Sequence, residues 1–119
     1  MKYTEDHEWL RVEDDLVVVG ITEHASTQLG DVVFVELPEI ETMVTKGDEI
    51  VVIESVKAAS DIVAPIDGEI VAVNDDLVDN PGLVNEDPLG AAWFFKIKAD
   101  DLSQLDDYLD EDAYKELIE

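Results

Sequence analysis

A single lysine stands between two short runs of β-branched residues, and this arrangement constrains the fold more than any other feature of the chain. Residues 50–53 (Ile-Val-Val-Ile) precede Lys57, and Ile62 and Val63 follow it. Such runs predict strands, and the short interval between them leaves room only for a turn. Lys57 is therefore predicted at the tip of a β-hairpin, with its backbone held and its amine free.

The neighbours of this lysine are unusual for the chain. Val56 and Ala58 flank Lys57 directly, whereas acids fill many other positions between the apolar runs. Lysine is mostly exposed in proteins, so a solvated turn residue is the ordinary interpretation. A collar of small apolar residues instead favours a lysine over which an enzyme must close.

The remaining patterns predict a mainly β protein. Apolar, β-branched runs predict further strands at residues 7–12, 16–19, 32–37, 69–73 and 92–97, with turns at 13–15, 46–48 and 67–68. Residues 49–53 and 69–73 are similar to each other and lie on either side of Lys57. Two such units suit a small β-sandwich or flattened barrel with the hairpin at one end. Trp93, Phe94 and Phe95 are assigned to core and sheet packing.

Helices are predicted in two places. Thr22 is suited to cap a short helix near residues 23–29, which Gly30 would end, and Ala25 and Leu29 would face the sheet. An amphipathic helical segment is predicted at about 101–119 from apolar residues at helical spacing, namely Leu102, Leu105, Leu109, Ala113, Leu117 and Ile118. Residues 76–90, rich in Asp, Asn, Pro and Gly, are typical of a loop.

Composition excludes several kinds of function. The chain has no cysteine, so any redox-active sulfur must arrive on a cofactor. With only His7 and His24, and no calcium-loop motif, no metal site is predicted. The 31 acidic and 7 basic residues give a formal charge of −24, which excludes nucleic acid and anionic membranes as partners.

The acidic excess has two interpretations. It would steer the chain toward basic partner surfaces, or it would form a solvated coat suited to the high internal salt of a halophile, and we favour the coat.

A monomer in one domain is expected, because two copies of so acidic a chain repel each other. The 119 residues suit one domain, spanning 1–119, and there is neither a stretch of roughly 18 apolar residues nor a signal-peptide pattern, so a cytoplasmic protein is expected.

Three segments carry a resemblance to a known family. Residues 54–58 (ESVKA), followed by 60–74 (SDIVAPIDGEIVAVN), resemble the modification site of a lipoyl carrier domain. Residues 6–12 (DHEWLRV), 20–39 (GITEHASTQLGDVVFVELPE) and 80–85 (NPGLVN) are similar to the H protein of the glycine cleavage system. The resemblance covers nearly the whole chain and implies a lipoyl-domain-like sandwich.

This resemblance implies a carrier that catalyses no step itself. Lipoate would be linked by an amide to Lys57 through a lipoate-attaching enzyme, on an arm reaching on the order of 10–15 Å from the backbone. The arm would receive an aminomethyl group from glycine decarboxylase (P protein) and deliver it to the tetrahydrofolate-dependent aminomethyltransferase (T protein). Dihydrolipoyl dehydrogenase (L protein) would then reoxidise the dithiol.

The resemblance also points to residues that would hold the loaded arm. A carboxylate beside the ammonium of the carried group, in a pocket that excludes water, would protect it from hydrolysis. Glu8 and Asp6 lie in the segment that lines the arm's resting cleft in the family, and Asp61 lies four residues beyond the lysine. Asp6 stands where the family often has a small hydroxyl residue.

Three positions on the chain qualify that picture. His7 is expected to be a structural residue at a strand start, and His24 a capping or surface residue. Gln28 stands where some relatives carry another histidine, so an arm contact that depends on imidazole is not expected from this helix.

Four alternatives remain at this point. A lipoyl domain of a 2-oxo acid dehydrogenase normally belongs to a longer chain and lacks a segment like DHEW. A biotin carrier typically has methionine on both sides of its lysine, where Val56 and Ala58 stand here. An unmodified acidic interaction module and an H-like protein that relays lipoyl groups to other complexes are the other two.

Overall fold

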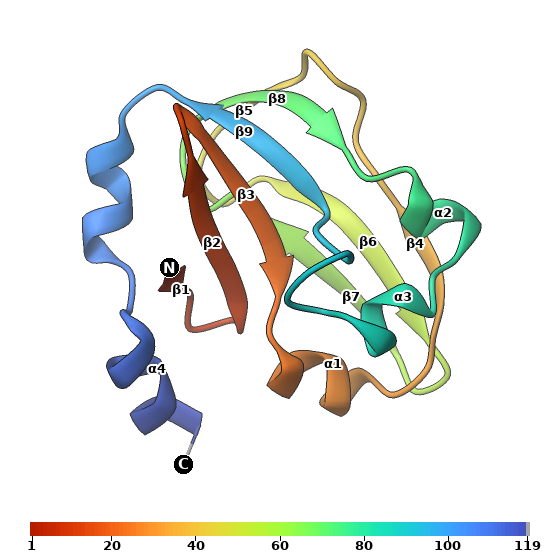
Figure 1. Cartoon of the computed structure of the whole chain (residues 1–119). Helices are drawn as coiled ribbons and strands as arrows, with labels where there is room; N and C mark the ends of the chain where they lie inside the picture. Colours follow the sequence, from red (N-terminus) through yellow and green to blue (C-terminus); the bar gives the residue numbers. More distant parts are fainter. Residues whose placement is uncertain (119) are drawn as a thin grey trace.

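The computed structural model describes residues 1–118, which form two antiparallel sheets with short helices around them (Figure 1). The six-stranded sheet has the order β1-β2-β3-β9-β8-β5, and the three-stranded sheet has the order β4-β6-β7. The strands are β1 (Lys2–Tyr3), β2 (Glu8–Glu13), β3 (Leu16–Ile21), β4 (Val32–Glu36), β5 (Met43–Val44), β6 (Glu49–Ser55), β7 (Ala59–Val63), β8 (Gly68–Val73) and β9 (Phe95–Ala99). The helices are α1 (Glu23–Leu29), α2 (Asp76–Asp79), α3 (Leu83–Glu86), the 3₁₀ helix η1 (Leu102–Asp107) and α4 (Glu111–Ile118). The predicted mainly β sandwich is confirmed.

The core lies where apolar side chains from both sheets meet. Val19 in β3 and Ile97 in β9 come from the larger sheet, and Ile53 in β6 comes from the smaller one; all three are at most 1% exposed. Phe94 and Phe95 are fully buried, as predicted. Trp93 is partly exposed and lies beneath the ammonium of Lys96, 5.0 Å from the ring centroid. One shared core therefore holds the two sheets in place around the hairpin.

The two similar segments on either side of Lys57 form β6 and β8, one in each sheet. β6 pairs with both β4 and β7, and the β6–β7 connection carries the lysine. The first strand of the hairpin, β6, is the central strand of the three-stranded sheet. It pairs with β4 on one side and β7 on the other, and both pairings anchor the hairpin.

The short helix α1 has the predicted bounds and cap. The hydroxyl of Thr22 accepts a hydrogen bond from the backbone N–H of Ala25 (3.2 Å), which satisfies one of the free donors of the first turn. Gly30 ends the helix, and Ala25 and Leu29 pack against the core, as predicted. The helix is thereby fixed beside the hairpin.

The prediction of a plain loop over 76–90 is wrong. This segment contains α2 and α3, each a single turn, whose Leu77 and Val84 are fully buried. Burial of these two side chains folds a stretch that its turn-forming composition had marked as irregular. The strand expected at 92–97 is also displaced, since β9 begins at Phe95; before it, the Phe94 N–H donates to the Val19 carbonyl (2.8 Å).

The C-terminal helical segment differs from its predicted pattern. Residues 102–107 form the 3₁₀ helix η1, and Leu109 pairs with Tyr3 as a β-bridge instead of continuing a helix. In α4 the buried side chain is Tyr114, whereas Leu117 is 47% exposed. Figure 1 shows η1 and α4 beside β1 and β2. The predicted C-terminal helical segment is therefore confirmed as two short helices, and Leu105 is buried in the core, but the predicted positions of Leu109 and Leu117 on a buried helix face are wrong. Residue 119 lies outside the described residues.

Candidate functional site at the Lys57 hairpin

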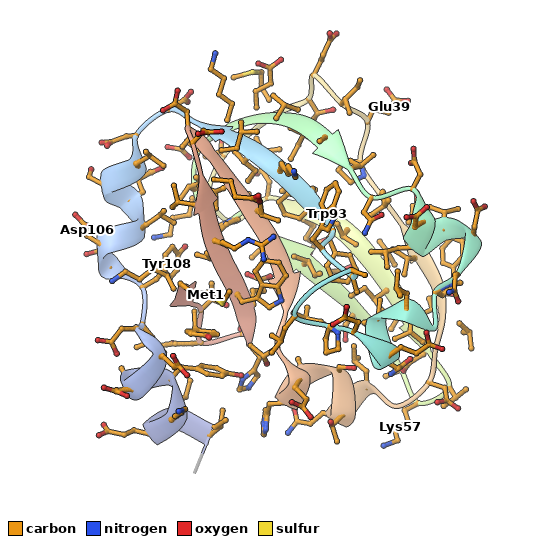
Figure 2. All side chains as sticks on the ribbon, viewed as in Figure 1. Met1, Glu39, Lys57, Trp93, Asp106 and Tyr108 are labelled. Carbon is orange, nitrogen blue, oxygen red and sulfur yellow. The ribbon has the colours of Figure 1, made fainter. Side chains whose placement is uncertain are left out.

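Lys57 lies at the tip of the β6–β7 hairpin, where Glu54 pairs with Ala59. Ser55 fastens this tip. Its hydroxyl donates to the Ala58 carbonyl (3.0 Å) and accepts from the backbone N–H groups of Lys57 and Ala58 (3.2 Å each). Figure 2 shows Lys57 at the outer end of the hairpin, outside the two sheets. The backbone of the lysine is thus fixed while its side chain is exposed.

The C-terminal end of α1 lies against the Lys57 side chain. Gly30 has a φ of +72°, a conformation that favours glycine, and a Cβ atom there would lie 3.2 Å from Cε of Lys57. The side-chain amide of Asn85 donates to the Gly30 carbonyl (2.6 Å), and its oxygen accepts from the Val32 N–H (2.9 Å). Asn85 therefore fixes the turn that leaves space for the lysine.

A cleft of about 350 Å³ is lined by residues of α1 and of the hairpin, and it reaches Ala58 beside the lysine. Its apolar lining comes from both sheets and from α1: Ile21, Ala25, Leu29, Ile53 and Ile62. Branched and straight aliphatic side chains suit an alkyl chain that leaves water. This part of the cleft can therefore receive a hydrocarbon arm attached at the hairpin tip.

The polar lining of the same cleft includes the three acids that the sequence singled out. Asp6 comes from the turn before β2, Glu8 is the first residue of β2, and Asp61 comes from β7. Asp6 and Asp61 are exposed, whereas Glu8 is 3% exposed. Gln28 of α1 also lines the cleft. The cleft therefore combines an apolar lining with carboxyl groups, a combination that suits a chain ending in a cation.

Glu8 is the electrostatically unusual group. Burial raises the pKa of its carboxyl to about 8, and the negative charge of Asp6 adds to the rise. Hydrogen bonds from the Val63 N–H (3.3 Å) and the Thr4 hydroxyl (3.4 Å) to the two carboxyl oxygens act in the opposite direction. A cation placed beside Glu8 would lower this pKa and favour the carboxylate.

His7 connects the cleft to the C-terminal helix. Its Nδ1 lies 2.8 Å from the Tyr114 hydroxyl, which in turn lies 2.7 Å from the Thr22 hydroxyl at the cap of α1. The His7 and His24 rings are 4.6 Å apart, and burial, followed by the effect of His24, lowers the pKa of His7. His7 has a positive φ of 69° just before β2. Tyr114 thereby joins residues 6–8 to the N-terminal cap of α1. We call residues 6–8, which line the cleft, the cleft wall.

Glu8 also borders a second cleft of about 310 Å³ on its other side. Tyr108 from the segment after η1 lines this cleft, and its hydroxyl donates to the Pro65 carbonyl. Lys46 stands over the Tyr108 ring, 5.2 Å from its centroid. Burial raises the pKa of Tyr108 to about 12, with a smaller contribution from Glu8. Glu8 therefore borders both clefts although it is only 3% exposed.

Four functional residues were missed from the sequence: Ser55, Gly30 in its contact with the lysine, Asn85 and Tyr114. Ser55 stood within the motif itself, and hydroxyl residues often bond to the backbone at turns, so this role had a local signal. Asn85 and Tyr114 act across long separations in the chain, 55 and 107 residues from their partners Gly30 and His7. No pattern in a single sequence indicates such pairs.

A fixed hairpin that presents one lysine beside a partly apolar, partly acidic cleft defines a carrier domain. The family model described as "Glycine cleavage H-protein" matches residues 1–119. The chain belongs to the glycine cleavage H-protein family, and it is accordingly a carrier subunit and not a catalyst.

Individual relatives agree with this assignment. "Glycine cleavage system H protein" of Xanthobacter autotrophicus is 56% identical over 119 residues, covering 100% of this chain and 95% of the relative. The protein of the same description from Escherichia coli O139:H28 is 58% identical over 120 residues, covering 100% and 93%. The crystal structure of a glycine cleavage system H protein from Mycobacterium marinum superposes with a TM-score of 0.88 at 38% identity, covering 97% and 93%.

Proposed function

We propose that the chain is the lipoyl carrier of a glycine cleavage system, with lipoate attached through an amide to Nζ of Lys57. The observation that carries the proposal is the position of Lys57: fixed at its backbone by Ser55, exposed at its amine, and next to a cleft. The family match supports lipoate attached to a lysine.

The residues present fit a lipoyl group. The aliphatic chain would lie along the apolar lining, for example Leu29 and Ile62, and its far end would come near the acids of the cleft. Amide formation removes the charge of Lys57, so the modified side chain would enter an apolar space without burying an ammonium. When bound, the lipoyl group supplies the cyclic disulfide chemistry that takes up and releases the aminomethyl group.

Glu8 and Asp61 would hold the ammonium of the carried group, and Asp6 would contribute from the cleft entrance. Glu8 is buried and hydrogen-bonded to Thr4 and Val63, so its carboxyl is held in one position. A buried carboxylate is a stronger partner for an ammonium than an exposed one, because less solvent screens the pair. Because Glu8 is buried, its side of the cleft would also keep water away from the carried group.

The partners follow from this function. The carrier would serve the glycine decarboxylase, the aminomethyltransferase and the dihydrolipoyl dehydrogenase in turn, after a lipoate-attaching enzyme has acted on Lys57. Tethering would keep the reactive end at a high effective concentration for each of them. We further propose that residues 1–119 act as one monomeric carrier domain in the cytoplasm. Within the described residues, no helix is long and apolar enough to cross a membrane.

The direct test is intact and peptide mass spectrometry of the protein purified from its own host, with Lys57→Ala as control. We expect one lipoyl adduct, confined to the peptide that contains Lys57 and absent from the variant. An unmodified Lys57 in lipoate-replete cells would overturn the proposal and favour an unmodified acidic interaction module. A normal adduct that glycine decarboxylase cannot load would point to a lipoyl relay protein.

We also propose that the acidic surface is a coat suited to the cytoplasm of a halophile. In the described part of the chain, only two ion pairs form, Arg11–Glu13 and Lys115–Glu111, and both are exposed. Most of the formal charge of −24 is thus unpaired and repulsive. Salt at 1 M reduces the Debye length to about 3 Å. The melting temperature should therefore rise between 0.1 and 2 M KCl; an unchanged value would contradict a coat adapted to salt.

A further inference from the structure

Strand β4 presents apolar side chains to solvent close to the hairpin that carries Lys57. It forms an edge of the three-stranded sheet, and its pairing with β6 contains a bulge: Val32 lies opposite Ser55, but Phe34 lies opposite Glu54. One extra residue is therefore inserted between them. The bulge leaves Val33 and Phe34 both exposed, where regular alternation would have turned one of them inward.

Three exposed apolar residues lie around the tip, and we name them the tip patch: Val33, Phe34 and Val56. They are 56%, 43% and 66% exposed. The Val56 N–H donates to the Asp31 carbonyl (3.0 Å), which joins the start of β4 to the hairpin tip. Figure 1 shows β4 alongside β6, and β4 begins beside the end of β6 that leads into that tip. None of the three side chains is buried in the core, and apolar residues gathered at one exposed place are typical of an interaction surface.

The surroundings of the tip patch are acidic. Asp31, Glu36 and Glu54 are all exposed and lie on the same two segments as the patch. The only basic residue in the ranges 31–36 and 54–59 is Lys57 itself. A complementary partner would therefore present an apolar centre with a basic rim.

Resting on the proposed function, we infer that the tip patch is the docking surface of the enzyme that attaches lipoate to Lys57. That enzyme must reach Nζ itself: the amine displaces AMP from lipoyl adenylate, forms the amide and loses one proton. It therefore has to cover the hairpin tip. Enzymes that act on the far end of the arm work on the order of 10–15 Å from the backbone of Lys57 and do not have to close over the tip.

The test uses the unmodified full-length chain with Val33→Thr and Phe34→Thr combined. Threonine is β-branched and suits a strand, and it replaces the apolar surface with a smaller, polar side chain. The lipoylation rate of Lys57 is followed by intact mass with a purified lipoate–protein ligase, lipoate and ATP. We expect kcat/KM to fall at least about tenfold, the usual effect of removing the central contacts of an interface.

The matched control is Ile40→Thr combined with Met43→Thr. These side chains are 56% and 66% exposed, and the neighbouring Glu39 lies at the opposite end of the molecule from Lys57 in Figure 2. The control should be lipoylated at the wild-type rate. If the β4 variant fails to fold, as judged by circular dichroism, Val56→Thr tests the same patch from the hairpin side.

Two outcomes would overturn the inference while leaving the proposed function in place. One is equal lipoylation rates for the tip-patch variants and wild type. The other is normal lipoylation with impaired loading by glycine decarboxylase, which would assign the tip patch to that enzyme. Failure of the wild-type chain itself to accept lipoate would instead overturn the proposed function, and this inference with it.

Discussion

The two ends of the site are built in opposite ways. At the hairpin tip, Lys57 is exposed and its backbone is held by Ser55 through bonds that span three residues or fewer. At the cleft wall, Glu8 is 3% exposed, and the adjacent His7 is bonded to Tyr114, 107 residues away in the chain. The hydrogen bonds that Ser55 makes to the hairpin turn are thus local, whereas the burial of Glu8 requires the whole fold. Attachment and protection of the carried group should therefore respond to different substitutions.

The largest expected effect is on the wall, in the pH dependence of stability. The pKa of Glu8 is raised from 4.5 to about 8 in the folded state. The protonated carboxyl therefore contributes to the free energy of unfolding, fully below pH 4.5, and this contribution is lost as the pH rises to about 8. Glu8→Gln keeps the shape and removes this titration. Wild type should lose on the order of 3–4 kcal/mol relative to Glu8→Gln between pH 5 and 8.

Urea denaturation of both proteins at the two pH values measures this difference, and the other carboxyl groups cancel in the comparison. A constant difference between the two proteins would mean that the carboxyl of Glu8 is not desolvated by the wall.

The next effect sharpens the contrast between wall and tip. Tyr114 is 5% exposed, stacks on Tyr3 and bonds to His7 and Thr22, so Tyr114→Ala should cost about 3 kcal/mol. Below its melting temperature, the variant should still be lipoylated at the wild-type rate, because no contact of Tyr114 reaches the tip. A rate that falls with Tyr114→Ala would show that the tip is not local.

Tyr114→Phe separates packing from hydrogen bonding. It retains the stacked ring and removes the hydroxyl that joins His7 to Thr22. A loss of about 1 kcal/mol is expected in thermal denaturation. Equal losses for the Ala and Phe variants would place the whole effect of Tyr114 in the hydroxyl.

The smallest expected effect belongs to the tip. Ser55→Ala removes a hydroxyl that bonds to Lys57 and Ala58, at a cost of about 1 kcal/mol or less because the tip is exposed. Its lipoylation rate should fall, while the pH dependence assigned to Glu8 stays unchanged. Lipoylation kinetics and the denaturation series above measure both. A shifted pH dependence would connect the two ends and break the distinction between them.

The same distinction explains what the sequence could predict. The hairpin, the cap at Thr22 and the end of α1 at Gly30 depend on neighbouring residues, so local patterns were sufficient. Residues 102–109 were predicted only in part: their leucine spacing favoured a helix, and 102–107 form a 3₁₀ helix, but Leu109 forms a bridge with Tyr3 instead of continuing it. Likewise, burial of Leu77 and Val84 folded two helical turns in a stretch with loop composition.

The candidate site follows the same rule. Lys57 stood out through its own neighbours, whereas Glu8, Asp61 and Asp6 were indicated by resemblance to a family and not by periodicity. Their common cleft arises because β2 and β7 are brought together by the fold. The burial of Glu8, which sets its pKa, is a tertiary property that its sequence position does not reveal.

The most direct test of the account is the lifetime of the glycine-loaded, lipoylated carrier in the absence of the aminomethyltransferase. Glu8→Gln is compared with wild type and with Glu5→Gln, since Glu5 borders the second cleft but not the cleft beside Lys57. We expect a lifetime shortened about tenfold or more in Glu8→Gln, because a charge-assisted hydrogen bond contributes roughly 1.5–3 kcal/mol. Glu5→Gln should match wild type. Equal lifetimes in all three proteins would contradict the account.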